Sequence, residues 1–337
     1  MLQIVLNQPG AFAAVQTAEP VPQPGDALVR VHRIGVCGTD LHAFRGKQPF
    51  FSYPRVLGHE LGVEVIEPGN AGNGIRAGDR CSVEPYLNCG ACIACRRGKP
   101  NCCAVLKVLG VHTDGGMRPL LALPSRKLHS SATLNYDQLA LVETLAIGAH
   151  AVERAQVEPE DFVLVIGAGP IGLSVIQFAR LHCRTLAVMD ISESRLEFCG
   201  KLLRVDTVLK PGPAAVEALK AADSGDLPSV VIDATGNPGS MAETFHLAAE
   251  GGRIVFVGLF QGDLSFNDPN FHRRELTLCG SRNALPGTFS TVISMIESGQ
   301  IDTVPWITHR FTLAETPERF PAMAADGSVL KAMVEVG

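Results

Sequence analysis

Residues 162–190 read FVLVIGAGPIGLSVIQFARLHCRTLAVMD, and this stretch decides the fold. Phe162–Ile166 predicts a buried strand, Pro170–Cys183 an apolar helix and Thr185–Asp190 a second strand. Between the first strand and the helix, Gly167-Ala168-Gly169-Pro170-Ile171-Gly172 matches the pattern G-x-G-x-x-G. The bare pattern is weak, but a strand before it and a helix after it are the context of a dinucleotide site.

Each glycine of this turn has a predicted task. Gly167 allows the tight turn, Gly169 lets a pyrophosphate approach the backbone, and Gly172 lets helix and strand pack closely. The helix begins at Pro170 and Ile171, so its N-terminus is expected to face the phosphates with its partial positive charge.

An acidic residue after the second strand indicates which dinucleotide is bound. Asp190 stands 18 residues after Gly172, close to the position that binds the adenosine ribose hydroxyls. Since a carboxylate repels a 2′-phosphate, NAD is predicted over NADP. Arg195, five residues on, leaves open NADP binding or stacking on the adenine.

The rhythm of strands and helices continues after this stretch, which predicts an α/β fold with a doubly wound parallel sheet. Further strands are predicted at Val205–Leu209, Val230–Asp233, Arg253–Gly258 and Glu275–Cys279, and helices at Glu193–Leu203, 214–222 and 238–249. The last of these strands is expected at the sheet edge, where it invites pairing with a second copy.

The two ends of the chain have a different pattern. Residues 1 to about 130 carry short β-like runs broken by Pro and Gly, which predicts a β domain with long loops. The tail, about 282–337, is expected to hold one helix, Thr288–Glu297, and short strands. Because it is too small to stand alone, we expect it to pack back onto the first domain.

Composition excludes several classes of protein. The chain has 337 residues, is 46% hydrophobic and carries a formal charge of −5, which argues against a disordered chain or a nucleic-acid partner. It contains no apolar run near the ~20 residues that cross a bilayer, and its start is not typical of a signal peptide. We therefore expect a cytoplasmic protein.

The cysteines are clustered, which favours a metal over disulfides. Six of the ten lie between residues 81 and 103. Cys89, Cys92, Cys95 and Cys103 have the spacing C-x2-C-x2-C-x7-C, which suits a closed, tetrahedral structural zinc site. Cys102 is the alternative fourth ligand, and an iron–sulfur cluster is the alternative metal group.

A second candidate metal site is dispersed along the chain. Cys37 lies in GVCGTDLH, His59 and Glu60 lie in GHE, and Glu143 comes much later. A thiolate, an imidazole and a carboxylate make a three-ligand zinc site with one open position.

These motifs, in this order, resemble those of the zinc-containing medium-chain dehydrogenases, especially sorbitol and other polyol dehydrogenases. The resemblance implies a GroES-like catalytic domain (1–145, completed by 282–337) with a zinc lobe near 88–104, and a Rossmann domain (146–281). It implies two zinc ions per subunit and a homodimer or homotetramer. It assigns Cys37 and His59 as catalytic-zinc ligands, with Glu60 or Glu143 as the third. Thr144 departs from the family, which usually has Pro there, so Glu143 is alternatively the residue that holds the zinc water.

The expected chemistry is hydride transfer from an alcohol whose pKa the open zinc site lowers. Thr39 and His42 match the relay positions by which the family passes the proton to solvent, and Glu60 is a further catalytic candidate. Arg282 is the candidate substrate residue, because it suits a sugar acid or the hydroxyls of a polyol.

Two stretches, LGVHTDGG (109–116) and SRNALPGTFSTVISMIESGQID (281–302), look similar to bacterial hexonate 5-dehydrogenases acting on L-galactonate or L-gulonate. The predicted substrate is therefore a polyol or sugar acid. The alternatives are a general zinc alcohol, threonine or butanediol dehydrogenase, and a non-catalytic relative on the same fold.

Overall fold

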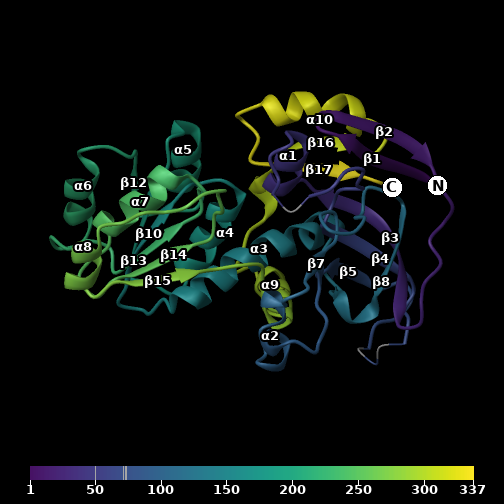
Figure 1. Cartoon of the computed structure of the whole chain (residues 1–337), viewed down its shortest axis with the longest axis horizontal. Helices are drawn as coiled ribbons and strands as arrows, with labels where there is room; N and C mark the ends of the chain where they lie inside the picture. Colours follow the sequence, from purple (N-terminus) through teal and green to yellow (C-terminus); the bar gives the residue numbers. More distant parts are fainter. Residues whose placement is uncertain (50, 71, 73) are drawn as a thin grey trace. The chain divides into compact units, whose positions relative to one another are not determined.

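The computed structural model describes residues 1–49, 51–70, 72 and 74–337, and it divides into two compact units. Unit 1 consists of Met1–Thr144 and Ala284–Gly337, and unit 2 of Leu145–Asn283. Within unit 1 the yellow C-terminal strands lie beside the purple N-terminal ones, because β17 (Lys331–Glu335) pairs with β3 (Asp26–Gly35) (Figure 1). Among the helices of the described residues, none is both long and apolar enough to span a membrane.

Unit 2 is built on one parallel sheet with the order β12-β11-β10-β13-β14-β15. Its strands are β10 (Phe162–Ile166), β11 (Thr185–Met189), β12 (Thr207–Leu209), β13 (Val230–Asp233), β14 (Arg253–Phe256) and β15 (Thr277–Gly280). Its helices are α4 (Pro170–Ala179), α5 (Glu193–Lys201), α6 (Ala215–Ala222), α7 (Pro238–Leu247) and α8 (Asp268–Arg273). The strand order reverses between β10 and β13, which is the switch point where such sheets bind nucleotides.

The predicted doubly wound parallel sheet is therefore confirmed, with β15 at an edge. The strands Phe162–Ile166 and Val230–Asp233 have their predicted bounds. Several other predicted ends were wrong by one to four residues, and α8 was not predicted.

Local hydrogen bonds explain these differences. The helix predicted to end at Cys183 ends at Ala179, because residues 180–183 close a turn in which Cys183 N bonds back to Ala179 O. The last strand begins at Thr277 because Glu275 takes a left-handed conformation, with φ of 50°. The strand before it ends at Phe256 because the next two amides both bond to Asp233 O.

Unit 1 is built on a mixed sheet with the order β16-β17-β3-β4-β5-β9, and β8 pairs with β3. Besides β3 and β17, these strands are β4 (Glu60–Glu67), β5 (Arg80–Val83), β8 (Leu120–Pro124), β9 (Leu128–Ser130) and β16 (Ile307–Thr312). Two small sheets join β1 (Leu2–Gln8) to β2 (Ala11–Gln16), and β6 (Tyr86–Leu87) to β7 (Lys107–Val108).

The helices of unit 1 are α1 (Gly38–Phe44), α2 (Ile93–Arg96), α9 (Pro286–Glu297), α10 (Thr316–Ala325) and the start of α3 (Tyr136–Ala155), with single 3-10 turns at Pro100–Cys102, Ser125–Lys127 and Val304–Trp306. Among these, α3, α9 and α10 are longer than the other helices. The fully described tail therefore holds two α-helices, and the expectation of one helix was wrong. Pro321 lies inside α10. Because proline disfavours the interior of a helix, the sequence does not indicate this one.

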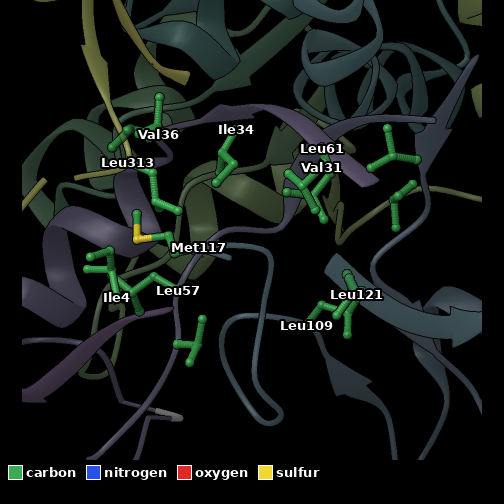
Figure 2. Close-up of a cluster of buried hydrophobic side chains, with 14 of the residues drawn as sticks. Ile4, Val31, Ile34, Val36, Leu57, Leu61, Leu109, Met117, Leu121 and Leu313 are labelled. Atoms are coloured by element: carbon green, nitrogen blue, oxygen red, sulfur yellow. The ribbon is translucent and has the colours of Figure 1, made fainter. Parts of the chain in front are cut away.

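The core of unit 1 consists of aliphatic side chains that alternate along β3 and β4 and meet the loops packed on them. Figure 2 shows this cluster, in which Val31, Ile34 and Leu61 from the sheet lie near Leu57 and Met117. All five are buried. This core holds the chain immediately before residues 58–60 in a fixed position.

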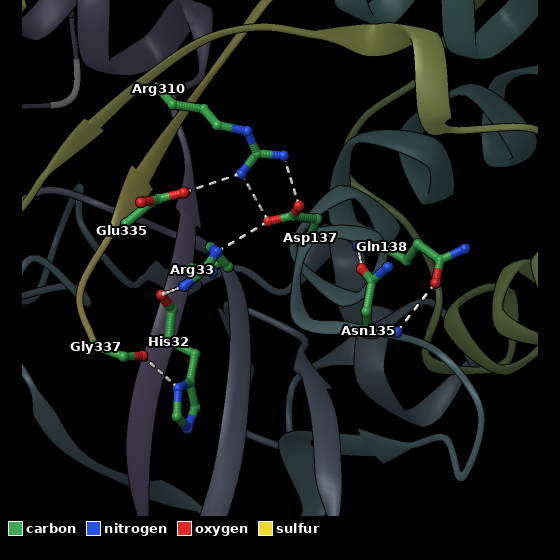
Figure 3. Close-up of polar contacts among 8 residues, drawn as sticks. All are labelled: His32, Arg33, Asn135, Asp137, Gln138, Arg310, Glu335 and Gly337. Carbon is green, nitrogen blue, oxygen red and sulfur yellow. Dashed lines mark hydrogen bonds and ion pairs between the residues drawn. The ribbon is translucent and has the colours of Figure 1, made fainter.

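A polar network ties the start of α3 to the sheet of unit 1. Asp137 accepts hydrogen bonds from Arg33 Nε at 3.0 Å and from Arg310 Nη2 at 2.6 Å (Figure 3). Arg310 Nη1 also donates to Glu335 at 3.2 Å, and these bonds raise the pKa of Arg310. The network joins β3, β16 and β17 to the helix that carries Glu143.

Replacing Asp137 with Asn should lower the free energy of unfolding of unit 1 by about 1–2 kcal/mol, because two arginines lose a charged acceptor. Denaturant titration would measure this change. Glu19→Gln, an acid-to-amide change at an exposed site in the same unit, is the matched control. Equal stability of the two variants would contradict the role given to the network.

Candidate active site

The dispersed metal candidates come together in unit 1. Cys37 follows β3 and stands immediately before α1. Glu60 begins the neighbouring strand β4, and His59 comes just before it. One ligand atom from each of the three lies within 4.8 Å of the others. His59 and Glu60 are buried and Cys37 is half-buried.

A glycine in the adjacent strand makes room for Glu60. Gly35 pairs with Glu60 across β3 and β4. A Cβ atom at residue 35 would lie 2.0 Å from Glu60 Oε2, so no larger residue fits there unless the carboxylate moves. Gly35, the first glycine of GVCG, thus leaves the space that the Glu60 carboxylate occupies.

Asp40 belongs to this site, although it was not predicted as a site residue. Its Oδ2 accepts a hydrogen bond from Cys37 N at 2.9 Å, and its Oδ1 lies 3.7 Å from His59 Nδ1. Burial raises the pKa of Asp40, and the neighbouring His59 opposes that effect. The separation of 3.7 Å is an ion-pair distance and not a hydrogen bond, so the Asp40 carboxylate acts on the His59 ring through its charge.

Lys331 is a second residue that was not predicted. Its Nζ donates to Glu60 Oε1 at 2.5 Å, forms an ion pair with Glu60 Oε2 and donates to Thr144 Oγ1 at 3.1 Å. All three side chains are buried. Thr144, the departure from the family pattern, thus helps to hold the ammonium group against Glu60.

Glu143 is buried near this cluster but lies outside the three-residue group. Its Oε1 accepts a hydrogen bond from the Tyr86 hydroxyl at 2.5 Å. Its Oε2 is buried and has no hydrogen-bond partner within the described ranges. Tyr86 was also not predicted, because it is 57 residues away from Glu143 in the chain.

The donor set fits a zinc ion. Thiolate sulfur, imidazole nitrogen and carboxylate oxygen are the usual zinc ligands, and three protein ligands leave a position open. The orphaned Oε2 of Glu143 is a further sign, since a buried charged oxygen without a donor is costly unless a cation or water is present.

The proposed relay residues lie on α1. Thr39 and His42 are three residues apart and therefore share a helix face. Thr39 is half-buried and His42 is exposed. Partial desolvation of the ring, together with Arg45 and Lys47, lowers the pKa of His42 below its usual value.

The four-cysteine lobe also assembles. Cys89, Cys92, Cys95 and Cys103 form one group with ligand atoms within 4.8 Å of one another, and Cys102 is exposed outside it. The sulfur atoms of Cys89 and Cys103 are 3.5 Å apart, and those of Cys92 and Cys95 are 3.6 Å apart. Four thiolates at this spacing fit a closed zinc site.

Backbone amides favour the thiolate form of two cysteines of the lobe, Cys89 and Cys92. Hydrogen bonds from the amides of Cys95 and Ala104 lower the pKa of Cys92 to about 6. Asn88 Nδ2 donates to Cys95 Sγ at 3.7 Å. Arg126 in turn donates to the side-chain oxygen and to the main-chain oxygen of Asn88. The lobe therefore has a hydrogen-bonded support as well as its four sulfur atoms.

The predicted nucleotide turn in unit 2 has the required shape. Gly167 has φ of 93°, and a Cβ at Gly172 would lie 1.7 Å from Gly167 O. Gly169 is the N-cap residue of α4, which begins at Pro170. Because Gly169 has no side chain, it does not cap the amides of the first turn, such as that of Ile171. A Cβ at Gly169 would meet only Arg195 Nη1, at 3.8 Å, so the space above the turn is open.

Asp190 follows β11 and braces this turn. Its Oδ2 accepts from Ala168 N at 2.6 Å, and its Oδ1 accepts from Ser192 N at 2.7 Å. The bond to Ser192 turns the chain away, which is why the strand ends at Met189 rather than at Asp190. Arg282 lies in unit 2, exposed just after β15, and its contact with substrate remains a prediction.

Comparison with known proteins gives the class. Residues 23–133 match the alcohol dehydrogenase GroES-like domain, and residues 170–298 match the zinc-binding dehydrogenase family. The chain is 42% identical to L-galactonate-5-dehydrogenase of Escherichia coli K12 over 320 residues, 94% of each chain.

Solved structures agree with this class. An alcohol dehydrogenase (RspB) of E. coli CFT073, in complex with NADH, is 30% identical and superimposes with a TM-score of 0.92 over 99% of each chain. A zinc-binding dehydrogenase of Sinorhizobium meliloti 1021 bound to NADP is 26% identical, with a TM-score of 0.89, over 99% of this chain and 98% of that one.

The chain therefore belongs to the zinc-type medium-chain dehydrogenases, and it is an oxidoreductase. Zinc and a nicotinamide nucleotide are the cofactors to which this membership points.

Replacing Cys103 with Ser should lower the zinc content by about one ion per chain, because the lobe loses one of four sulfur ligands. Metal analysis by mass spectrometry after dialysis against a weak chelator measures this loss. Cys102→Ser, one residue away and outside the group, should keep the zinc content of the parent protein. Loss of metal from the Cys102 variant instead would show that the lobe is ligated differently.

Proposed function

We propose that this protein oxidises a secondary hydroxyl of a polyol or sugar acid, such as a hexonate of the L-galactonate or L-gulonate kind, with NAD as the acceptor. The observation that carries the proposal is the convergence of Cys37, His59 and Glu60 in the unit that lacks the nucleotide turn. The similarity to L-galactonate-5-dehydrogenase supports the substrate class.

The residues around Cys37 have distinct tasks in this reaction. Cys37, His59 and Glu60 would hold the catalytic zinc, and the charge of Asp40 would act on the His59 ring at its Nδ1 side. When bound, zinc supplies a Lewis acid that lowers the pKa of an alcohol, and the nicotinamide ring supplies the hydride acceptor. Glu143 would hold the zinc water through its Oε2, which has no hydrogen-bond partner among the described residues.

Thr39 and His42 would carry the alcohol proton out of the site. The hydroxyl of Thr39, two residues after Cys37, accepts the proton and passes it toward His42, which is exposed to solvent. Because the pKa of His42 is lowered, its ring stays neutral and able to accept a proton at pH 7.

The nucleotide is held by unit 2 in this proposal. The turn Gly167–Gly172 and the N-terminus of α4 receive the pyrophosphate, with Arg195 above Gly169. Asp190 keeps lone pairs for the ribose hydroxyls beside its two backbone contacts, and its charge disfavours a 2′-phosphate. Arg282 would bind a substrate carboxylate or hydroxyls, and a homodimer or homotetramer would form through the β15 edge.

A substrate panel tests the proposal. Zinc-loaded protein should reduce NAD, and NADP much less, with polyols or aldonates as donors, followed by absorbance of the reduced cofactor. Threonine, 2,3-butanediol and simple primary alcohols belong in the panel. Turnover on these alone would favour a different dehydrogenase, and no turnover on any donor would favour a non-catalytic relative. Cys37→Ser, which loses a proposed metal ligand, is the inactive control.

Replacing His42 with Ala should slow alcohol oxidation at least about tenfold, chiefly below neutral pH, where hydroxide cannot replace the lost acceptor. In the parent protein the rate should fall only as pH drops through the lowered pKa of His42, where the ring becomes protonated. Added imidazole should partly restore the variant. His182→Ala, an exposed histidine in unit 2, is the control. An unchanged pH–rate profile would remove His42 from the relay.

A further inference from the structure

The sheet of unit 2 contains a buried acidic side chain that has no part in the proposed reaction. Asp233 is the last residue of β13, the strand that pairs with β10 at the switch point of the sheet (Figure 1). Its side chain is fully buried. Because burying a carboxylate costs several kcal/mol unless it is well partnered, its position calls for an explanation.

Among the described residues, the donors to the Asp233 side chain all lie in the segment that follows it. Its Oδ1 accepts hydrogen bonds from Thr235 N at 2.8 Å and from Thr235 Oγ1 at 2.7 Å, and its Oδ2 accepts from Ser240 Oγ at 2.5 Å. Thr235 Oγ1 in turn accepts from Asn237 N at 3.0 Å, and Asn237 caps the start of α7. The carboxylate therefore organises residues 235–240 into the loop that leads to α7.

This loop packs directly against the nucleotide turn. A Cβ atom at Gly167 would lie 3.0 Å from Thr235 Cγ2, and a Cβ atom at Gly172 would lie 3.7 Å from Ala234 Cβ. The start of the loop is also bonded to the strand that carries the turn, because Ala234 N donates to Ile166 O at 2.8 Å. The turn thus has the first residues of this loop as its immediate neighbours.

The segment that follows β14 approaches the same loop from the other neighbouring strand. Val257 N and Gly258 N both donate to the main-chain oxygen of Asp233, at 2.9 and 3.2 Å. A Cβ atom at Gly258 would lie only 2.2 Å from Gly236 N, so the two chains are in close contact. The loop therefore has close neighbours on both sides, and its hydrogen bonds to the Asp233 side chain fix its shape between them.

From this arrangement we infer that Asp233 is a positioning residue for the nucleotide. Its carboxylate holds the loop at Thr235 against Gly167, which keeps the turn in the shape that receives the pyrophosphate. Because a pyrophosphate binds to backbone amides, a small displacement of the turn weakens several hydrogen bonds at once. The inference rests on the proposed placement of the nucleotide at Gly167–Gly172. Asp233 acts through the loop and needs no contact with the nucleotide.

The test measures the dissociation constants of NADH and ADP-ribose for the full-length protein by isothermal titration calorimetry. ADP-ribose shares the pyrophosphate of NADH but lacks the nicotinamide. The variants are Asp233→Ala and Asp233→Asn, whose amide can still accept from Thr235 and donate to Ser240. The matched control is Asp161→Ala. Asp161 is also buried and accepts from a serine, Ser229, but it precedes β10 and so lies at the opposite end of the sheet.

Asp233→Ala should weaken the binding of NADH and of ADP-ribose by the same factor, about tenfold, because the loop loses its acceptor. Asp233→Asn should restore both dissociation constants to within about threefold of the parent values. Asp161→Ala should lower the free energy of unfolding, measured by denaturant titration, but leave both dissociation constants unchanged. A merely structural role for Asp233 would make the two alanine variants alike.

Unchanged binding in Asp233→Ala, equal losses in the two alanine variants, or no recovery in Asp233→Asn would overturn the inference and leave the proposed function standing. A loss for NADH without one for ADP-ribose would do the same, because the turn receives the part that the two molecules share.

If Asp233→Ala does not fold, Ser240→Ala decides, since it leaves one oxygen of the buried carboxylate without its donor. This variant should bind both molecules about threefold more weakly, and parent affinity in it would overturn the inference. A parent protein that binds neither NADH nor ADP-ribose would overturn the inference together with the proposed nucleotide site.

Discussion

Charge balance among buried side chains is the constraint on which the metal centre depends. Asp40, Glu60 and Glu143 are buried together with the half-buried Cys37, and Lys331 is the buried ammonium group among them. Four potential anions thus face one lysine and one imidazole, an arrangement that is unfavourable unless further positive charge is present. A divalent cation supplies that charge. Each of the three carboxylates also has a specific partner: the Cys37 amide for Asp40, the Lys331 ammonium group for Glu60 and the Tyr86 hydroxyl for Glu143.

Strand pairing brings these side chains together. Glu60 begins β4, Gly35 ends β3 beside it, and Lys331 begins β17 on the other side of β3. The ends of three neighbouring strands therefore lie at one place. They carry the candidate ligand Glu60, the glycine that leaves room for it, and its counter-ion Lys331. The Asp137 network and the apolar cluster keep these strands and α3 in register.

The local motifs were readable from sequence because the chemistry and its spacing lie within a few residues. The glycine turn, the four cysteines and the GHE triplet are all of this kind, and the structure assembles each of them. Asp40 was also within reach, since it lies three residues after Cys37 and bonds to its amide. The ends of strands were harder to predict. A hydrogen bond from the backbone to a side chain, such as that from Ser192 N to Asp190, ends a strand without any break in the hydrophobic pattern.

The partners of the two glutamates were not predictable from one sequence. Lys331 is 271 residues from Glu60, and Tyr86 is 57 residues from Glu143. A single lysine or tyrosine has no spacing that marks it as the partner of a distant carboxylate. These long-range pairs appear only when the sheet of unit 1 and the start of α3 are formed, and they give the two glutamates different partners.

The central claim is that a metal ion is held by Cys37, His59 and Glu60 with one position left open. Anomalous diffraction at the zinc edge from crystals of the zinc-loaded protein tests it most directly. We expect a peak bonded to these three side chains and to one ligand that does not come from the protein. A fourth protein side chain on the ion in every state, or a peak confined to the four-cysteine lobe, would contradict the account.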